Sequence, residues 1–183
     1  MPLIHLVLGG ARSGKSGFAE KVAQTAFEQS QSVNKSLEKS SLTYLATATA
    51  GDDEMKARIA HHQQRRGPEW QLLEEPLNLA EVVDNASKQT TILIDCLTLW
   101  LSNCLHHGCW PEHRTNFLSS LENSSANIIL VSNEVGSGIV PMGELSRQFV
   151  DESGWLQQQV AAIASDVTLV VAGLEMPLKR AGR

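Results

Sequence analysis

Short runs rich in Val, Ile and Leu alternate along the chain with longer segments of helical period. A continuous apolar run predicts a strand buried on both faces of a sheet, and apolar residues recurring every three or four positions predict a helix. The predicted strands are Leu3–Leu8, Leu42–Thr47, Thr91–Asp95, Ile128–Ser132 and Val167–Ala172, with a weaker one at Trp70–Leu73. The predicted helices are Lys15–Glu28, Asp52–Arg65, Leu79–Ser87, Leu97–Leu105, Gly143–Ala164 and, with a less regular pattern, His113–Glu122.

Alternating strands and helices predict an α/β fold with a mainly parallel sheet, because each helix returns the chain to the start of the next parallel strand. With 183 residues the chain fits one domain over residues 1–183. The polar segment 29–41 is predicted to be a mobile surface excursion. The tail 176–183, which carries three basic residues, is predicted to fray.

Composition and charge narrow the class of protein. The chain is 42% hydrophobic with a net charge of −5, which argues against a general nucleic-acid binder. No apolar run reaches the ~20 residues of a membrane span, and the start lacks the basic region of a secretory signal. Three cysteines fit a reducing compartment better than a disulfide scaffold. We therefore expect a cytoplasmic protein.

A phosphate-binding loop follows the first predicted strand. The residues match G-x-x-x-x-G-K-S and open a predicted helix: Gly9, Gly10, Ala11, Arg12, Ser13, Gly14, Lys15 and Ser16. Glycines let successive N–H groups point at phosphate oxygens, and the helix N-terminus adds partial positive charge. Lys15 would reach the β- and γ-phosphates and Ser16 would bind Mg²⁺. A chance match in a glycine-rich turn is the alternative, which the strand before and the helix after disfavour.

A second acidic group completes this pattern. Asp95 ends the apolar run that begins at Thr91, as the carboxylate that holds the metal or its water does in such nucleotide sites. An aspartate in that position can equally cap the next helix. Beside a phosphate-binding loop we favour the metal-binding role, and a nucleoside triphosphate as the ligand.

Three further stretches carry a resemblance to a known family. They are TAGDDEMKARIAHH (residues 49–62), DCLTLWLSN (95–103) and NEVGSGIVP (133–141). With GGARSGKS they make the chain resemble, from Leu3 to about Gly173, the bifunctional adenosylcobinamide kinase/adenosylcobinamide-phosphate guanylyltransferases of cobalamin biosynthesis. The chain departs from the family's usual residues at Val150, Trp155 and Gln157.

The resemblance implies a P-loop NTPase fold of RecA-like type and two reactions. The enzyme would phosphorylate the corrinoid adenosylcobinamide with ATP or GTP, and then transfer GMP from GTP to the new phosphate through a guanylyl-histidine. It also implies Mg²⁺ as cofactor and a homo-oligomer, with a trimer as one form. Two alternatives stay open: a P-loop kinase of another small metabolite without covalent GMP, and a non-enzymatic nucleotide switch.

The histidine that the resemblance makes the GMP carrier is His62. A helix that starts near Asp52 places Arg58 and His62 at positions i and i+4 on one face and turns His61 away. Imidazole is largely unprotonated near neutral pH, and a neighbouring arginine would keep it so. From the residues alone, a solvated polar helix remains an alternative; a zinc site is disfavoured because adjacent histidines diverge.

The resemblance adds other binding positions. For the nucleotide they are Thr49, Ala50, Gly51, Arg58, Gly67, Pro68, Glu69, Trp70 and Glu74. Trp70 would stack on the base or pack in the core. Asn133 and Glu134 follow a buried strand, where they would contact the corrinoid, with Glu134 as a general base, or simply form a capped turn.

Cys104, Cys109 and His113 gather thiols and an imidazole in a short stretch that also contains His106 and His107. Soft ligands of this kind can bind zinc, but their spacing matches no standard zinc-binding pattern. We predict a helix end followed by an insertion here.

Overall fold

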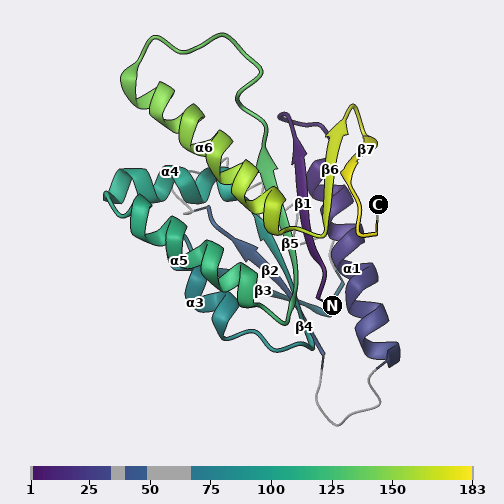
Figure 1. Ribbon diagram of the computed structural model, residues 1–183. Coiled ribbons are helices and arrows are strands. Elements are labelled where there is room, and N and C mark those ends of the chain that lie inside the picture. Colours follow the sequence, from purple (N-terminus) through teal and green to yellow (C-terminus); the bar gives the residue numbers. More distant parts are fainter. Residues whose placement is uncertain (1, 34–39, 49–66, 183) are drawn as a thin grey trace.

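A seven-stranded sheet with strand order β3-β2-β4-β5-β1-β6-β7 forms the centre of the protein in the computed structural model, which describes residues 2–33, 40–48 and 67–182 (Figure 1). The first six strands run parallel to their neighbours, and β7 runs antiparallel to β6. The strands are β1 (Ile4–Gly9), β2 (Ser41–Ala46), β3 (Trp70–Glu74), β4 (Thr90–Asp95), β5 (Asn127–Asn133), β6 (Asp166–Val171) and β7 (Leu174–Lys179).

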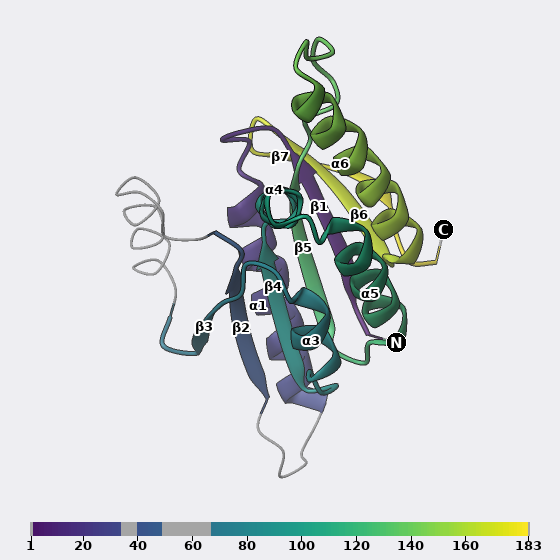
Figure 2. The ribbon, with the colours of Figure 1, turned by 90° about the vertical axis from the view of Figure 1, so that its left-hand side faces the viewer.

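Helices cover both faces of this sheet. The helix α1 (Lys15–Val33) lies on one face, and four helices lie on the other (Figure 2). These four are α3 (Leu79–Asp84), α4 (Leu97–His107), α5 (Trp110–Asn123) and α6 (Glu144–Ile163). Each face therefore has its own apolar core.

Successive side chains of the central strands pack into the two cores in turn. On β5, Ile128 and Leu130 pack with the four-helix face, whereas Ile129 and Val131 pack with α1. All four side chains are fully buried. Successive side chains of a strand point to opposite faces, so a strand covered on both faces must be apolar at every position. This physical reason explains why the sequence pattern predicted the five buried strands, to within one or two residues at their ends.

The C-terminal tail was predicted wrongly. Residues 174–179 form β7, which pairs with β6 through Val171↔Leu174 and Val170↔Glu175. Ala172 and Gly173 join the two strands with φ angles of 52° and 78°. Two positive φ angles are what a tight hairpin turn requires, and the resulting pairing orders the tail.

Other predicted boundaries also need correction. Helix α1 continues to Val33 and β2 already begins at Ser41, so the segment predicted as a surface excursion is partly helix and strand. Helix α3 ends at Asp84, short of the predicted Ser87. The insertion predicted after α4 is absent, because α5 begins at Trp110. The predicted helix 52–65 lies outside the described residues.

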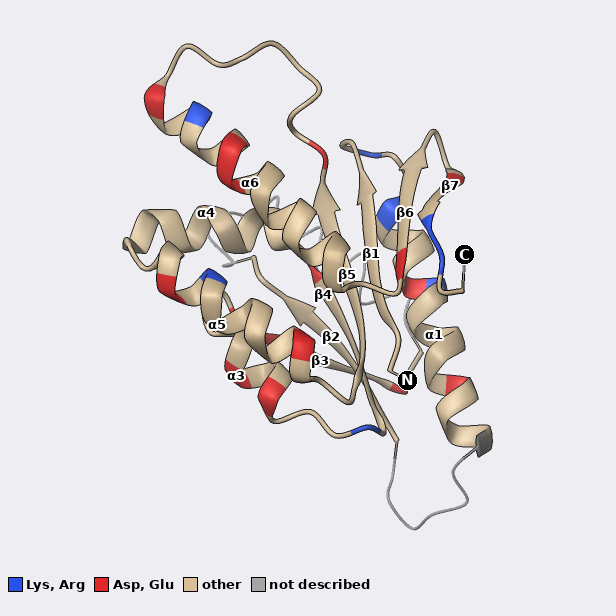
Figure 3. Cartoon of the chain, in the orientation of Figure 1, with Lys and Arg blue, Asp and Glu red and all other residues tan. Residues whose placement is uncertain are grey.

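The surface carries its charges in a dispersed way. Acidic residues are spread over α3, α5 and α6, and the basic residues in the same view are scattered except for a basic stretch at the end of β7, where Lys179 and Arg180 are adjacent (Figure 3). Across the described ranges, no helix is both long enough and apolar enough to cross a membrane.

Candidate functional site

The carboxyl ends of the six parallel strands meet at one edge of the sheet, where open α/β sheets bind their ligands. β1 ends at Gly9, β4 at Asp95 and β5 at Asn133. β5 lies between β1 and β4 in the sheet. The structure therefore brings the phosphate-binding loop, Asp95 and the Asn133–Glu134 pair to the same edge, as the sequence predicted.

The loop after β1 is a compact turn. The backbone N–H of Ser13 donates to the carbonyl of Gly10 at 3.3 Å, and Lys15 Nζ donates to the same carbonyl at 3.1 Å. Arg12 and Gly14 have φ angles of 56° and 96°. Positive φ angles curl the backbone into an anion-binding concavity ahead of the 19-residue helix α1.

Two features of this loop fit a phosphate ligand. A Cβ atom on Gly9 would lie 2.5 Å from Ser13 Oγ and 2.6 Å from the carbonyl oxygen of Val170, so glycine is required there. Ser13 Oγ is buried and has no hydrogen-bond partner among the residues that the structure describes. Buried hydroxyls are normally hydrogen-bonded, and a phosphate oxygen would be a suitable acceptor for this one.

Asp95 is held in place from the neighbouring strand. Tyr44 on β2 donates its hydroxyl to Asp95 Oδ2 at 3.1 Å. The ring of Tyr44 meets Trp70 of β3 edge-on, with centroids 6.5 Å apart. Together with the hydroxyl of Ser16, the carboxylate of Asp95 offers the hard oxygen ligands that Mg²⁺ prefers, so the residues present fit this ion.

Thr47 connects the end of β2 to the end of β4 by hydrogen bonds. Its Oγ1 donates to the carbonyl of Cys96 at 2.7 Å and accepts the N–H of Cys96 at 2.9 Å. Asn103 donates Nδ2 to the carbonyl of Thr47 at 2.8 Å. Burial, with a smaller contribution from Asp95, raises the pKa of Cys96. This shift favours the neutral thiol over the thiolate.

The β5 end is tied to the phosphate-binding loop. The N–H of Glu134 donates to the carbonyl of Gly9 at 3.1 Å. Gln157 on α6 donates Nε2 to the carbonyl of Asn133 at 2.8 Å. Glu134 Oε1 accepts the N–H of Gly136 at 2.7 Å, which is the capped turn considered from the sequence. The corrinoid role of Asn133 and Glu134 stays a prediction.

The predicted guanine-side residues divide into two groups. Gly67, Pro68 and Glu69 precede the edge strand β3, on which Trp70 is half-buried and Glu74 is exposed. Trp70 packs against the α1-side core. The other predicted nucleotide positions, Thr49, Ala50, Gly51 and Arg58, lie outside the described residues, as does the predicted GMP carrier His62.

Sequence reasoning missed three residues that position the site: Tyr44, Thr47 and Gln157. Tyr44 and Thr47 both lie within the predicted strand Leu42–Thr47, where a polar group among apolar residues is the available signal. Gln157 is one of three consecutive glutamines on α6, and only the fold shows that it reaches β5.

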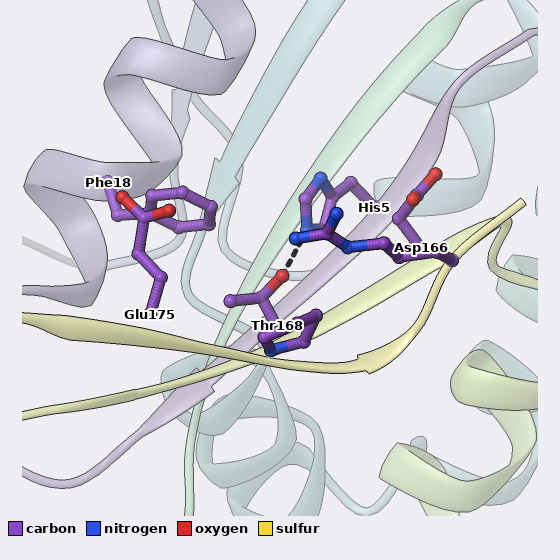
Figure 4. A pocket seen from close by; sticks show the side chains of 7 residues that line it. His5, Phe18, Asp166, Thr168 and Glu175 are labelled. Carbon is purple, nitrogen blue, oxygen red and sulfur yellow. Dashed lines mark hydrogen bonds between the residues drawn. The ribbon is translucent and has the colours of Figure 1, made fainter.

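A pocket of about 270 Å³ lies away from this edge, near the start of β1 (Figure 4). His5 Nε2 lies 2.9 Å from Thr168 Oγ1 within it, and Asp166 and Glu175 line it. Burial lowers the pKa of His5, although the two carboxylates oppose this shift. His5 is four residues before Gly9, so this pocket is separate from the phosphate-binding loop.

Comparisons with known proteins identify the family. The model of the family described as "Cobinamide kinase / cobinamide phosphate guanyltransferase" matches residues 5–178. The chain belongs to this family. It is 48% identical over 178 residues to the bifunctional adenosylcobalamin biosynthesis protein CobP of Pseudomonas aeruginosa, covering 95% of this chain and 96% of that protein. It is 35% identical to the protein CobU of the same description in Escherichia coli, covering 97% and 100%.

This membership makes the chain a kinase and guanyltransferase of cobalamin biosynthesis, as the sequence predicted. Among solved structures, the flagellar accessory protein FlaH of Methanocaldococcus jannaschii aligns with a TM-score of 0.50 at 11% identity. The alignment covers 98% of this chain and 79% of FlaH. With the strand order and the loop after β1, this likeness confirms the predicted P-loop NTPase fold of RecA-like type.

Proposed function

We propose that this cobinamide kinase/guanyltransferase phosphorylates adenosylcobinamide with ATP or GTP and then transfers GMP from GTP to adenosylcobinamide phosphate, giving adenosylcobinamide-GDP and pyrophosphate. The observation that carries the proposal is the phosphate-binding loop at the same sheet edge as Asp95, with a Ser13 hydroxyl that is buried and has no hydrogen-bond partner within the described part of the chain. The family membership supplies the corrinoid acceptor.

In the kinase step, a corrinoid hydroxyl oxygen attacks the γ-phosphorus, the bond from this phosphorus to the β,γ-bridging oxygen breaks, and the nucleoside diphosphate leaves. Lys15 would exchange its contact with Gly10 for the phosphates, and Glu134 would accept the hydroxyl proton. Ser16 and Asp95 would hold Mg²⁺, which neutralises phosphate charge when bound.

In the transferase step, an imidazole nitrogen of His62 attacks the α-phosphorus of GTP and pyrophosphate leaves. The phosphate oxygen of the corrinoid then attacks the same phosphorus, the P–N bond breaks, and His62 is released. The support for His62 is its place in the family resemblance and its suitability as a neutral nucleophile.

Doubly labelled GTP tests the proposal. With adenosylcobinamide as acceptor, both the γ-label and the α-label are expected on the corrinoid product. A γ-label alone would favour the simple metabolite kinase, and neither label would favour the nucleotide switch. Lys15→Ala is expected to lose both transfers, whereas Lys21→Ala, on the exposed side of α1, is the matched control that retains them.

A further inference from the structure

Three potential metal ligands meet where α4 ends and α5 begins. The Sγ atoms of Cys104 and Cys109 and one ring nitrogen of His113 all lie within 4.8 Å of one another. We call these three residues the thiol–imidazole cluster. Helix α4 starts just after Asp95, and Cys104 lies seven residues beyond Leu97, about 10 Å along the helix axis. The cluster is therefore separate from the nucleotide site.

A tight turn between the helices brings the cluster together. Gly108 ends α4 with a φ of 68°, a left-handed conformation that favours glycine. The N–H of Cys109 then donates back to the carbonyl of Cys104 at 3.0 Å. The first turn of α5 follows, in which the N–H of His113 donates to the carbonyl of Cys109 at 3.2 Å. The backbone thus fixes all three positions.

The imidazole of His113 is oriented by a backbone carbonyl. Nδ1 of His113 lies 2.9 Å from the carbonyl oxygen of Leu77. A carbonyl only accepts, so Nδ1 carries the proton and Nε2 is the nitrogen with a lone pair in the neutral ring. Trp100 also donates to this carbonyl, at 2.7 Å, which holds it in position. Histidines that bind metals characteristically donate their other ring nitrogen in this way.

We propose that Cys104, Cys109 and His113 bind a zinc ion through two thiolates and Nε2, with solvent in the fourth position. Zinc with Zn–S bonds of about 2.3 Å spaces two sulfurs about 3.8 Å apart in a tetrahedral site, so the two Sγ atoms, which lie within 4.8 Å of each other, need to approach by no more than about 1 Å. Cys104 is fully buried, whereas Cys109 and His113 are half-buried and give the ion a way in from solvent.

Binding releases the two thiol protons as the two Zn–S bonds form. Burial, with the adjacent Cys109, raises the pKa of Cys104 to about 12, so this group is a neutral thiol in the absence of metal. A bound divalent cation compensates the negative charge of two neighbouring thiolates and so favours their deprotonation. The zinc affinity is therefore expected to increase steeply as pH rises. A disulfide between the two cysteines is the competing chemistry for the same atoms.

Metal titration of the full-length, reduced protein tests the proposal. Cobalt(II) serves as the coloured probe, read by its thiolate charge-transfer absorbance, and zinc is measured by displacing it. The informative variants are Cys109→Ala and His113→Asn, because asparagine can still donate to the Leu77 carbonyl but has no Nε2. His107→Ala is the matched control, since His107 lies at the same helix end outside the cluster.

We expect one cobalt per chain with a thiolate band, displaced by zinc, and a loss of affinity of about 100-fold or more in both informative variants. The control is expected to bind like the wild type. A wild type without the thiolate band, a band that survives Cys109→Ala, or a loss in His107→Ala would overturn the proposal. A Cys104–Cys109 disulfide in protein purified from a reducing cytosol would do the same.

Discussion

Individual polar side chains at the carboxyl edge of the sheet are fixed by partners from other strands and helices. Tyr44 holds Asp95, Thr47 holds Cys96, and Gln157 holds the end of β5. A site held in this way presents its charged groups in one geometry before the ligand arrives, which reduces the reorganisation that binding and reaction require.

His5 makes stability depend on pH. Its pKa lies below the ordinary value of about 6.5 because it is buried, so the unfolded chain binds more protons than the folded one below that value. The free energy of unfolding is therefore unaffected by protonation of His5 above about pH 6.5, and it decreases as pH falls from there toward the lowered pKa of the folded protein. Denaturant unfolding of wild type and His5→Gln at about pH 7.5 and pH 5.5 measures this effect.

The wild type is expected to lose more stability than His5→Gln over that interval, because glutamine can keep a hydrogen bond to Thr168 without titrating. An equal loss in the two proteins would contradict the assignment to His5.

At the scale of elements, the β1–loop–α1 unit depends on the absence of a side chain at Gly9. Gly9→Ala would place a methyl group against Ser13 Oγ and the carbonyl oxygen of Val170. Overpacking of this kind costs about 1–3 kcal/mol, and the loop must deform to relieve it. We expect lower unfolding stability and at least about tenfold weaker nucleotide binding, measured by denaturation and by titration with GTP.

Gly17→Ala is the matched control. A Cβ atom there would meet no atom of residues 2–33, 40–48 and 67–182 within 4 Å, and the residue lies in α1, where alanine is favoured over glycine. This variant is expected to retain nucleotide binding and to be at least as stable as the wild type. Equal behaviour of the two alanine variants would show that the loop tolerates a side chain at Gly9.

The elements that the sequence predicted best are those buried on two faces. Strand β5 is predicted by a continuous apolar run because both cores use it. In the exposed edge strand β7, Leu174, Met176 and Leu178 alternate at strand period, but Pro177 within the run argues against a paired strand. The phosphate-binding loop and Asp95 were predictable because each directly follows or ends one apolar strand, so a short stretch of sequence identifies it. The contact of Gln157 with Asn133 and the proximity of Cys104 and His113 could not be predicted, because they depend on how separate helices pack in the folded chain.

At the scale of the whole molecule, the loop after β5 and the start of α6 project from the body (Figure 1), and several of their apolar side chains are exposed. Ile139 is 98% exposed and Met142 is 97% exposed. Val140 and Leu145 add to this surface, and Trp155 is exposed further along α6. Large exposed apolar surfaces of this kind mark interaction sites. We propose that they pack against another copy of the chain in a homo-oligomer.

Light scattering after size exclusion tests the oligomer. Wild type is expected at a multiple of the 19.9 kDa chain mass, with three copies as the form that the family resemblance implies. Ile139→Glu combined with Met142→Glu is expected to shift the mass toward a single chain, because charges there oppose burial. Ser137→Glu, an exposed polar position of the same loop, is the control. A monomeric wild type would contradict the prediction.

The central claim is that one enzyme combines phosphoryl transfer with covalent GMP transfer through His62. Incubation with α-labelled GTP and Mg²⁺, without corrinoid acceptor, tests it most directly. We predict an acid-labile label on the protein that is absent from His62→Ala and retained in His61→Ala, because P–N bonds to imidazole hydrolyse in acid and only one histidine of the pair is the carrier. An unlabelled wild-type protein, or a label that survives in His62→Ala, would contradict the account.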